Sequence, residues 1–216
     1  LSAARDLRAG HWTSTLHHWQ CRFYDWIDGE YREVSDDAIR SEVWRELDAR
    51  DDPPTSRSVS GVVDALKAEC HLPEDIDPPC WLGKPGPRNI IATATRLIDV
   101  DSGDALPPNP SYFTLSASPV EFDADAECPA WGDFLAQLWP DDPSSIETLQ
   151  EVFGYFLTQD TRQQKLFLMV GPKRAGKGTI FRVLTHLLGR RNVAAPTLSS
   201  LSENFGLQSL IGKQAA

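Results

Sequence analysis

This chain of 216 residues has no long apolar runs. It also lacks the pattern of a secretory signal peptide, which is a positively charged start, an apolar middle and a cleavage site of small residues. A membrane-spanning helix needs roughly 20 consecutive apolar residues, so the sequence predicts no membrane segment. Without a span or a signal, we expect a cytoplasmic protein. The chain also begins at Leu1 rather than at a methionine, which we interpret as a sign that it is a fragment.

Closely spaced cysteine pairs are missing as well, because none of the four cysteines forms a C-x-x-C sequence. Such pairs are typical of structural zinc sites and of redox motifs. A zinc site remains as an alternative, from the neighbouring His17, His18 and Cys21 or from Cys70, His71 and Cys80. Reduced, partly buried thiols are the simpler interpretation in a cytoplasmic chain.

Basic residues are scarce, with 21 Lys and Arg against 31 Asp and Glu and a formal net charge of −10. The imbalance is uneven along the chain. Residues 155–216 hold nine basic and two acidic side chains, a net charge of +7, whereas the remaining residues carry −17. A basic segment attracts polyanions such as nucleotides. The acidic part is not expected to hold nucleic acid by general electrostatics.

A strand, loop and helix pattern stands out between Leu166 and Gly189. The apolar run Leu166–Val170 predicts a buried strand, and residues 171–179 then read GPKRAGKGT. This sequence has the G-x-x-x-x-G-K spacing of a phosphate-binding loop. Apolar residues follow at helical spacing, namely Ile180, Val183, Leu184, Leu187 and Leu188. Gly189 stands where a helix C-cap is expected.

The residue types in this loop suit phosphate chemistry. Gly171 and Gly176 let the backbone curl so that several N–H groups face one point beside a helix N-terminus. Lys177 can place its ammonium on the β- and γ-phosphates of ATP and is the candidate catalytic residue. The strict motif continues with Ser or Thr, which hold magnesium, but Gly178 follows here, so Thr179 is the candidate for that role. The predicted nucleotide-binding residues are Gly171, Pro172, Lys173, Arg174, Ala175, Gly176, Lys177, Gly178 and Thr179.

The first part of the chain predicts a β-hairpin. Apolar and polar residues alternate through Trp19, Cys21 and Phe23, and Asp28-Gly29 is a favoured two-residue turn. A tryptophan every seven residues over 12–26 leaves a helix as the alternative. We interpret these tryptophans as core residues rather than as base-stacking side chains.

Helices and short strands are expected after the hairpin. Ser35 begins a helix whose inner face is Ile39, Val43, Trp44 and Leu47, and a second helix covers about residues 58–70. A proline-rich linker over 73–87 has Trp81 as its large anchor, and short strands follow over 89–116.

Two more helices are expected between residue 129 and the phosphate loop, with apolar stripes of Trp131, Phe134, Leu135 and Leu138 and of Ile146, Leu149, Val152, Phe153, Phe156 and Leu157. The nearby acids Asp141, Asp142, Glu147 and Glu151 fit a helix start and a solvated face better than a catalytic carboxylate pair. After the loop helix we expect a short strand near Val193 and a short helix from Ser199 to Leu210.

Together these patterns predict a mixed α/β protein in three parts. Residues 1–128 form an N-terminal domain of helices and small antiparallel strands, and residues 129–160 form a helical connector. Residues 161–216 begin a P-loop ATPase with a parallel sheet.

An ordered series of short motifs gives a family resemblance from about residue 15 onward. The motifs are Phe23-Tyr24-Asp25-Trp26 through Tyr31, Leu97–Gly103, Tyr112-Phe113-Thr114, Cys128–Trp131 with Phe134-Leu135, Leu149-Gln150-Glu151, Gly154-Tyr155, Gln164-Lys165, Gly171–Thr179, Phe205-Gly206 and Gly212-Lys213. In this order they resemble the C-terminal half of phage and plasmid primase–helicases, which are superfamily 3 helicases related to the poxvirus primase–helicase.

The resemblance implies an ATP-driven ring helicase for plasmid, phage or prophage DNA replication. It implies ATP and magnesium as cofactors, a hexamer around single-stranded DNA, and an arginine that the neighbouring subunit supplies to each ATP site. In the family pattern Lys177 holds the β- and γ-phosphates and Thr179 helps with magnesium. The water-polarising acidic strand should follow Lys213 within a few residues, so we expect the 216 residues to bind ATP but not to turn it over efficiently.

Two other functions fit parts of the sequence. The ending GKGT also occurs in nucleoside monophosphate kinases, but those enzymes carry the loop at the N-terminus, and here 170 residues precede Gly171 and 37 follow Thr179. The acidic front part fits a non-enzymatic oligomerisation or loading module that binds a replication partner protein.

Overall fold

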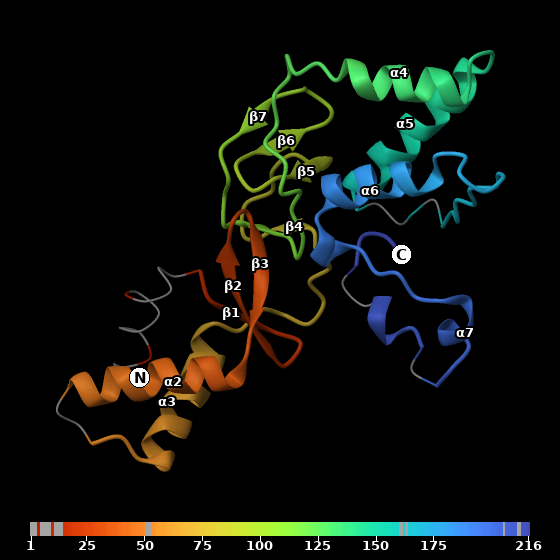
Figure 1. Cartoon of the computed structure of the whole chain (residues 1–216). Coiled ribbons are helices and arrows are strands. Elements are labelled where there is room, and N and C mark those ends of the chain that lie inside the picture. The colour runs from red at the N-terminus through yellow and green to blue at the C-terminus, as the bar shows by residue number, and fades with distance from the viewer. Residues whose placement is uncertain are drawn as a thin grey trace. The chain divides into compact units, whose positions relative to one another are not determined.

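The computed structural model describes residues 4, 10, 15–50, 53–159, 162, 164–204, 206–210 and 213–216. It divides into two compact units, Leu1–Pro85 with Pro110–Leu115 (unit 1) and Gly86–Asn109 with Ser116–Ala216 (unit 2). Figure 1 shows the helices and the small sheets of a mixed α/β fold, which confirms the predicted class. The sequence-based domain limits at residues 128 and 160 stay a prediction. Trp12, Phe205 and Gly212, which entered the sequence analysis, lie outside the described residues.

The predicted hairpin is present in unit 1 as part of a three-stranded antiparallel sheet of β1 (His17–Trp19), β2 (Arg22–Ile27) and β3 (Glu30–Val34). Asp28 and Gly29 join β2 to β3 with φ of 51° and 81°, as a two-residue turn with two positive φ angles requires.

The place of Cys21 in this sheet is a correction. The alternating pattern put Cys21 on a strand, but it lies in the β1–β2 turn with Gln20, at φ of 63° and 46°. Positive φ is uncommon in residues other than Gly, Asn and Asp, so nothing in the sequence marked this turn.

Two capped helices follow the sheet. In α2 (Asp36–Ala49) the Ser35 side chain accepts a hydrogen bond from the N–H of Ala38. α3 (Ser56–Glu69) begins two residues earlier than predicted, because Thr55 and Ser58 form a reciprocal capping box. Each cap satisfies backbone donors at a helix start that have no partner within the helix.

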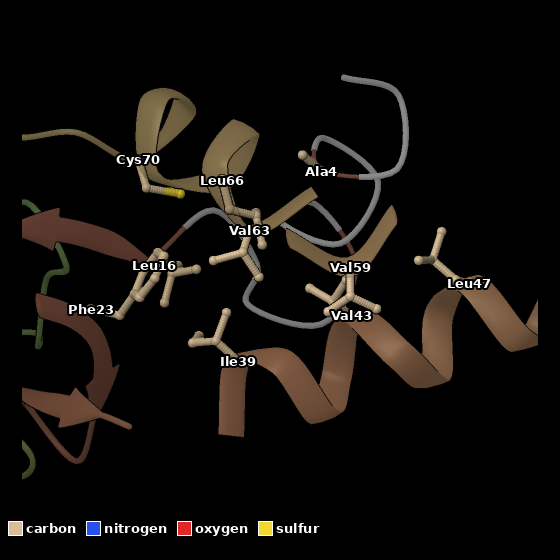
Figure 2. Packing of buried hydrophobic residues seen from close by; sticks show 10 residues of the cluster. All are labelled: Ala4, Leu16, Phe23, Ile39, Val43, Leu47, Val59, Val63, Leu66 and Cys70. Carbon is tan, nitrogen blue, oxygen red and sulfur yellow. The ribbon is translucent and has the colours of Figure 1, made fainter. Parts of the chain in front are cut away.

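The first core of unit 1 lies where α2 and α3 meet. Figure 2 shows its side chains gathered between the two helices and the start of the sheet: Ala4, Leu16, Phe23, Ile39, Val43, Leu47, Val59, Val63, Leu66 and Cys70. Trp44 was predicted on the inner face, but its side chain is 47% exposed. Residues four apart share a helix face, so Ile39, Val43 and Leu47 point inward together while Trp44 is rotated away from them.

A second core of unit 1 includes side chains from Pro110–Leu115, which follow Leu1–Pro85 only after a segment that belongs to unit 2. The proline-rich linker contains a strand that the sequence analysis missed, β4 (Cys80–Trp81), which pairs antiparallel with β8 (Tyr112–Phe113). Phe113 is fully buried against Trp19 and Tyr31. The Tyr31 hydroxyl donates to the Pro110 carbonyl at 2.7 Å. These contacts explain why residues 110–115 belong to unit 1.

The zinc alternative gains no support from the part of the chain that is described. No group of three or more His, Cys, Asp or Glu in it could hold a metal ion. None of the four cysteines, all of them described, is in a disulfide: Cys70 is buried, Cys80 is half-buried, and Cys21 and Cys128 are exposed.

His18 joins the sheet of unit 1 to the end of α3. Its N–H donates to the carbonyl of Cys70 at 2.8 Å, and its carbonyl accepts from the N–H of Leu72 at 2.9 Å. These bonds use the main chain alone, so the imidazole can be replaced without removing them.

We expect unit 1 to lose stability in mild acid through His18. Burial lowers the pKa of its imidazole, the positive charges of Lys67 and His71 lower it further, and Asp36 opposes them. Protonation therefore favours the unfolded chain, so stability is full above the ordinary pKa of 6.5 and falls as the pH drops below it. Urea unfolding should show a lower midpoint at about pH 5.5 than at about pH 7.5, and His18→Gln should reduce that difference. An equal pH dependence in both proteins would contradict this prediction.

Unit 2 begins with the antiparallel strands β5 (Ile90–Ala92), β6 (Leu97–Asp99) and β7 (Ala105–Leu106). The predicted helices then follow as α4 (Pro129–Leu138), α5 (Pro143–Leu157) and α6 (Lys177–Leu188). One residue from each of these helices is buried in a shared core, Leu135, Leu149 and Ile180. No helix of the described residues is both long and apolar enough to cross a membrane.

The strand predicted over Leu166–Val170 is not formed. Leu166 and Val170 are each 86% exposed and Leu168 is 78% exposed. A buried strand needs hydrogen-bonding neighbours on both sides, and no described residue pairs with this segment. The expected parallel sheet is accordingly not found in the described ranges, where every sheet is antiparallel.

The C-terminal elements also differ from expectation. Val193 makes an isolated bridge with Ala215 instead of a strand. The helix expected to run from Ser199 to Leu210 is one turn, α7 (Leu198–Leu201), capped by Thr197, and a separate 3₁₀ turn, η2, covers Gln208–Leu210. A second 3₁₀ turn, η1 (Arg190–Asn192), follows α6.

Candidate functional site

The candidate site is the loop that leads into α6. Residues 171–176 form an irregular, largely exposed turn, and the helix begins at Lys177, as the motif predicted. Arg174 and Gly176 have positive φ of 64° and 74°. These two left-handed residues bend the chain back before the helix starts, which agrees with the curled loop expected from its glycines.

Lys177 folds back over this loop. Its ammonium donates to the carbonyl of Gly171 at 2.7 Å and to the carbonyl of Pro172 at 2.8 Å. A Cβ at Gly171 would lie 3.7 Å from the Lys177 ammonium and 3.6 Å from the Ala175 Cβ, which is ordinary van der Waals contact, so Gly171 lies next to the ammonium. The arrangement places a cation inside a curved backbone at a helix N-terminus, the chemistry that holds a phosphate.

Thr179 lies in the first turn of α6, with its N–H donating to the Gly176 carbonyl at 2.9 Å. Its hydroxyl accepts a hydrogen bond from the Arg182 guanidinium at 3.1 Å. Arg182 was not among the predicted site residues, although its position three residues beyond Thr179 puts both on one helix face. Arg182 thus uses one of the two lone pairs of the Thr179 oxygen.

A cleft of about 670 Å³ opens beside the loop, within unit 2. Its walls come from α4, α5, residues 166–172 and α6, and they are mostly apolar. Lys177 is the only charged residue among the described ones that line it. Of the predicted site residues, four line this cleft together, namely Gly171, Pro172, Ala175 and Lys177. The other five do not line it, namely Lys173, Arg174, Gly176, Gly178 and Thr179.

The acidic residues at the start of α5 and along it lie at a helix start and on a solvated face, as predicted. Asp142 caps α5, where its carboxylate accepts from the Ser145 N–H at 3.1 Å and from the Ser145 hydroxyl at 2.6 Å. The hydroxyl bond and the backbone bond both lower the pKa of Asp142. Asp141, Glu147 and Glu151 are exposed. This is a helix cap and a solvated face, not a catalytic carboxylate pair.

The packing that supports the loop was not predicted from the sequence. A Cβ built on Gly176 would lie 2.9 Å from a methyl carbon of Leu138 and 3.0 Å from the ring tip of Phe134. Both residues are on the α4 stripe that was assigned to the core. No local signal could reveal that this helix reaches a loop almost 40 residues further along.

Comparison with known proteins gives one family. A family model described as D5 N terminal like matches residues 8–140, which is more than half of the chain and ends before the loop. No curated protein matches the chain.

Proposed function

The chain belongs to the D5 N terminal like family, the N-terminal domain of D5-like primase–helicase proteins, and from this premise we propose that it acts in an ATP-dependent DNA helicase of phage, prophage or plasmid replication. Family membership relates it to primase–helicase replication proteins. The ATP dependence is our inference, and the observation that carries it is the Lys177 ammonium folded into the curved loop at the start of α6.

In this proposal the loop binds the phosphates of ATP. The Lys177 ammonium would exchange its two carbonyl acceptors for β- and γ-phosphate oxygens, since bonds between two charged groups are the stronger ones. Backbone N–H groups at the N-terminus of α6 would add further donors. Thr179 is the proposed magnesium-side ligand. ATP supplies the phosphoryl group that is transferred to water, a reaction that positioning and charge stabilisation promote.

We propose single-stranded DNA as the substrate track and a homo-oligomer, a hexamer around the strand, as the working form. The charge distribution fits an ATP site in the basic segment 155–216 and a replication partner protein on the acidic remainder. No membrane partner is proposed. A loading module without catalysis is the second candidate, supported by the acidic charge alone.

The test is strand displacement by the full-length gene product with magnesium and ATP. We expect unwinding with ATP and none with ADP or a non-hydrolysable ATP analogue, because phosphoryl transfer drives translocation. Unwinding that does not depend on the nucleotide, or no unwinding with intact ATP binding, would favour the loading module. Phosphate transfer to a nucleoside monophosphate in the same reactions would instead indicate a kinase.

A further inference from the structure

The loop rests on a helix of the family-matched segment. Gly176, the N-cap of α6, lies so close to α4 that any side chain there would meet the Leu138 methyls at 2.9 and 3.0 Å and the Phe134 ring tip at 3.0 Å. Real Cβ atoms essentially never come within 3.0 Å of another atom, so a Cβ at Gly176 would fit only if the nearer Leu138 methyl moved. The two α4 side chains therefore fill the space against the loop backbone. α4 ends within residues 8–140, whereas the loop lies outside them.

α4 is itself held firmly. Leu135 is 2% exposed and packs with Leu149 of α5 and Ile180 of α6. The Phe134 ring stacks on Trp131 with 5.5 Å between centroids, and Trp131 stacks on Phe153 at 6.1 Å. Side chains locked by such packing can fix the position of the backbone that touches them.

Gly176 directly precedes Lys177, so its position sets where the ammonium and the first helical N–H groups point. Small displacements matter in such a site, because a shift of about 1 Å at a reacting centre can cost about 100-fold in rate. Arg174 in this loop also has a positive φ, a conformation that residues other than glycine keep only with the support of their surroundings.

We propose that Phe134 and Leu138 are positioning residues of the nucleotide site: α4 presses on Gly176 and holds the loop and Lys177 in the conformation that binds the phosphates of a nucleoside triphosphate. This inference rests on the proposed ATP-binding function. It also makes α4 the element through which the family-matched segment and the nucleotide site affect each other. The coupling is reciprocal: nucleotide binding at the loop stabilises the packing of α4 by the same free energy by which that packing strengthens nucleotide binding.

The experiment measures the Kd of the 216-residue chain for magnesium-ATP by calorimetry, together with thermal unfolding without nucleotide. Leu138→Ala should raise the Kd about tenfold, because the loop loses its support. Leu138→Met should restore most of the affinity, since methionine reaches as far as leucine. Ile146→Ala is the matched control: Ile146 packs in the same core as Leu138 but does not line the cleft. It should lower the melting temperature while leaving the Kd unchanged.

The outcomes separate the two proposals. Wild-type affinity in folded Leu138→Ala, or an equal rise of the Kd in Ile146→Ala, would overturn the positioning role while leaving ATP binding in place. If the wild-type chain does not bind magnesium-ATP, both proposals fail. Should Leu138→Ala not fold, Phe134→Leu decides instead, because it keeps apolar bulk but removes the ring tip that faces Gly176.

Discussion

Replacing Lys177 with alanine should abolish ATP-driven unwinding by the full-length gene product and leave its fold intact. The ammonium contacts the carbonyls of Gly171 and Pro172 and takes no part in the buried core of unit 2. Losing a charge-assisted bond to phosphate costs about 1.5–3 kcal/mol of binding, which is roughly a 10- to 150-fold higher Kd for ATP. A solvated substitution usually changes the free energy of unfolding by less than about 0.5 kcal/mol.

Three measurements check this expectation: calorimetric titration with magnesium-ATP, strand displacement, and thermal unfolding with and without nucleotide. Lys165→Ala is the matched control, because it removes the same charge from an exposed position six residues before Gly171. It should retain unwinding. A melting temperature many degrees lower in Lys177→Ala without nucleotide would mean that the lysine holds the loop together through its two carbonyl contacts and is structural.

The features that the sequence predicted well are local. The turn at Asp28-Gly29, the cap at Ser35 and the apolar stripes of α4, α5 and α6 each depend on residues within a few positions of one another. In such stretches propensity, capping and periodicity indicate the same element, which makes the prediction secure. The helix after residues 171–176 belongs to this group, because its apolar spacing is a local pattern, whereas phosphate binding by these residues stays a prediction.

The features that the sequence missed depend on distant partners. An apolar run such as Leu166–Val170 has strand composition, but a strand forms only where a neighbour accepts and donates its backbone bonds. β4 was missed for the opposite reason: Cys80 and Trp81 stand among prolines, and their partners in β8 lie 33 and 31 positions further along the chain. The contact of α4 with Gly176 is likewise invisible without the tertiary structure.

Phe113 provides the sharpest test of such long-range structure, and Phe113→Ala should be the most destabilising of the substitutions considered. The ring is fully buried in unit 1, with its centroid 4.8 Å from that of Tyr31 and 5.7 Å from that of Trp19. Removing a buried phenylalanine ring costs about 3–5 kcal/mol, from lost burial and the cavity left behind. A domain has only about 5–15 kcal/mol of stability, so this loss is a large part of the total.

Urea unfolding followed by tryptophan fluorescence measures the loss, because Trp19 and Trp26 report on the core around Phe113. Phe113→Leu keeps an apolar side chain and should cost less than Phe113→Ala, because it leaves a smaller cavity. Phe122→Ala is the control: this ring is 38% exposed in unit 2, and its removal should change the free energy of unfolding of unit 1 by less than about 0.5 kcal/mol. Equal, small effects of Phe113→Ala and Phe122→Ala would show that residues 110–115 do not complete the core of unit 1.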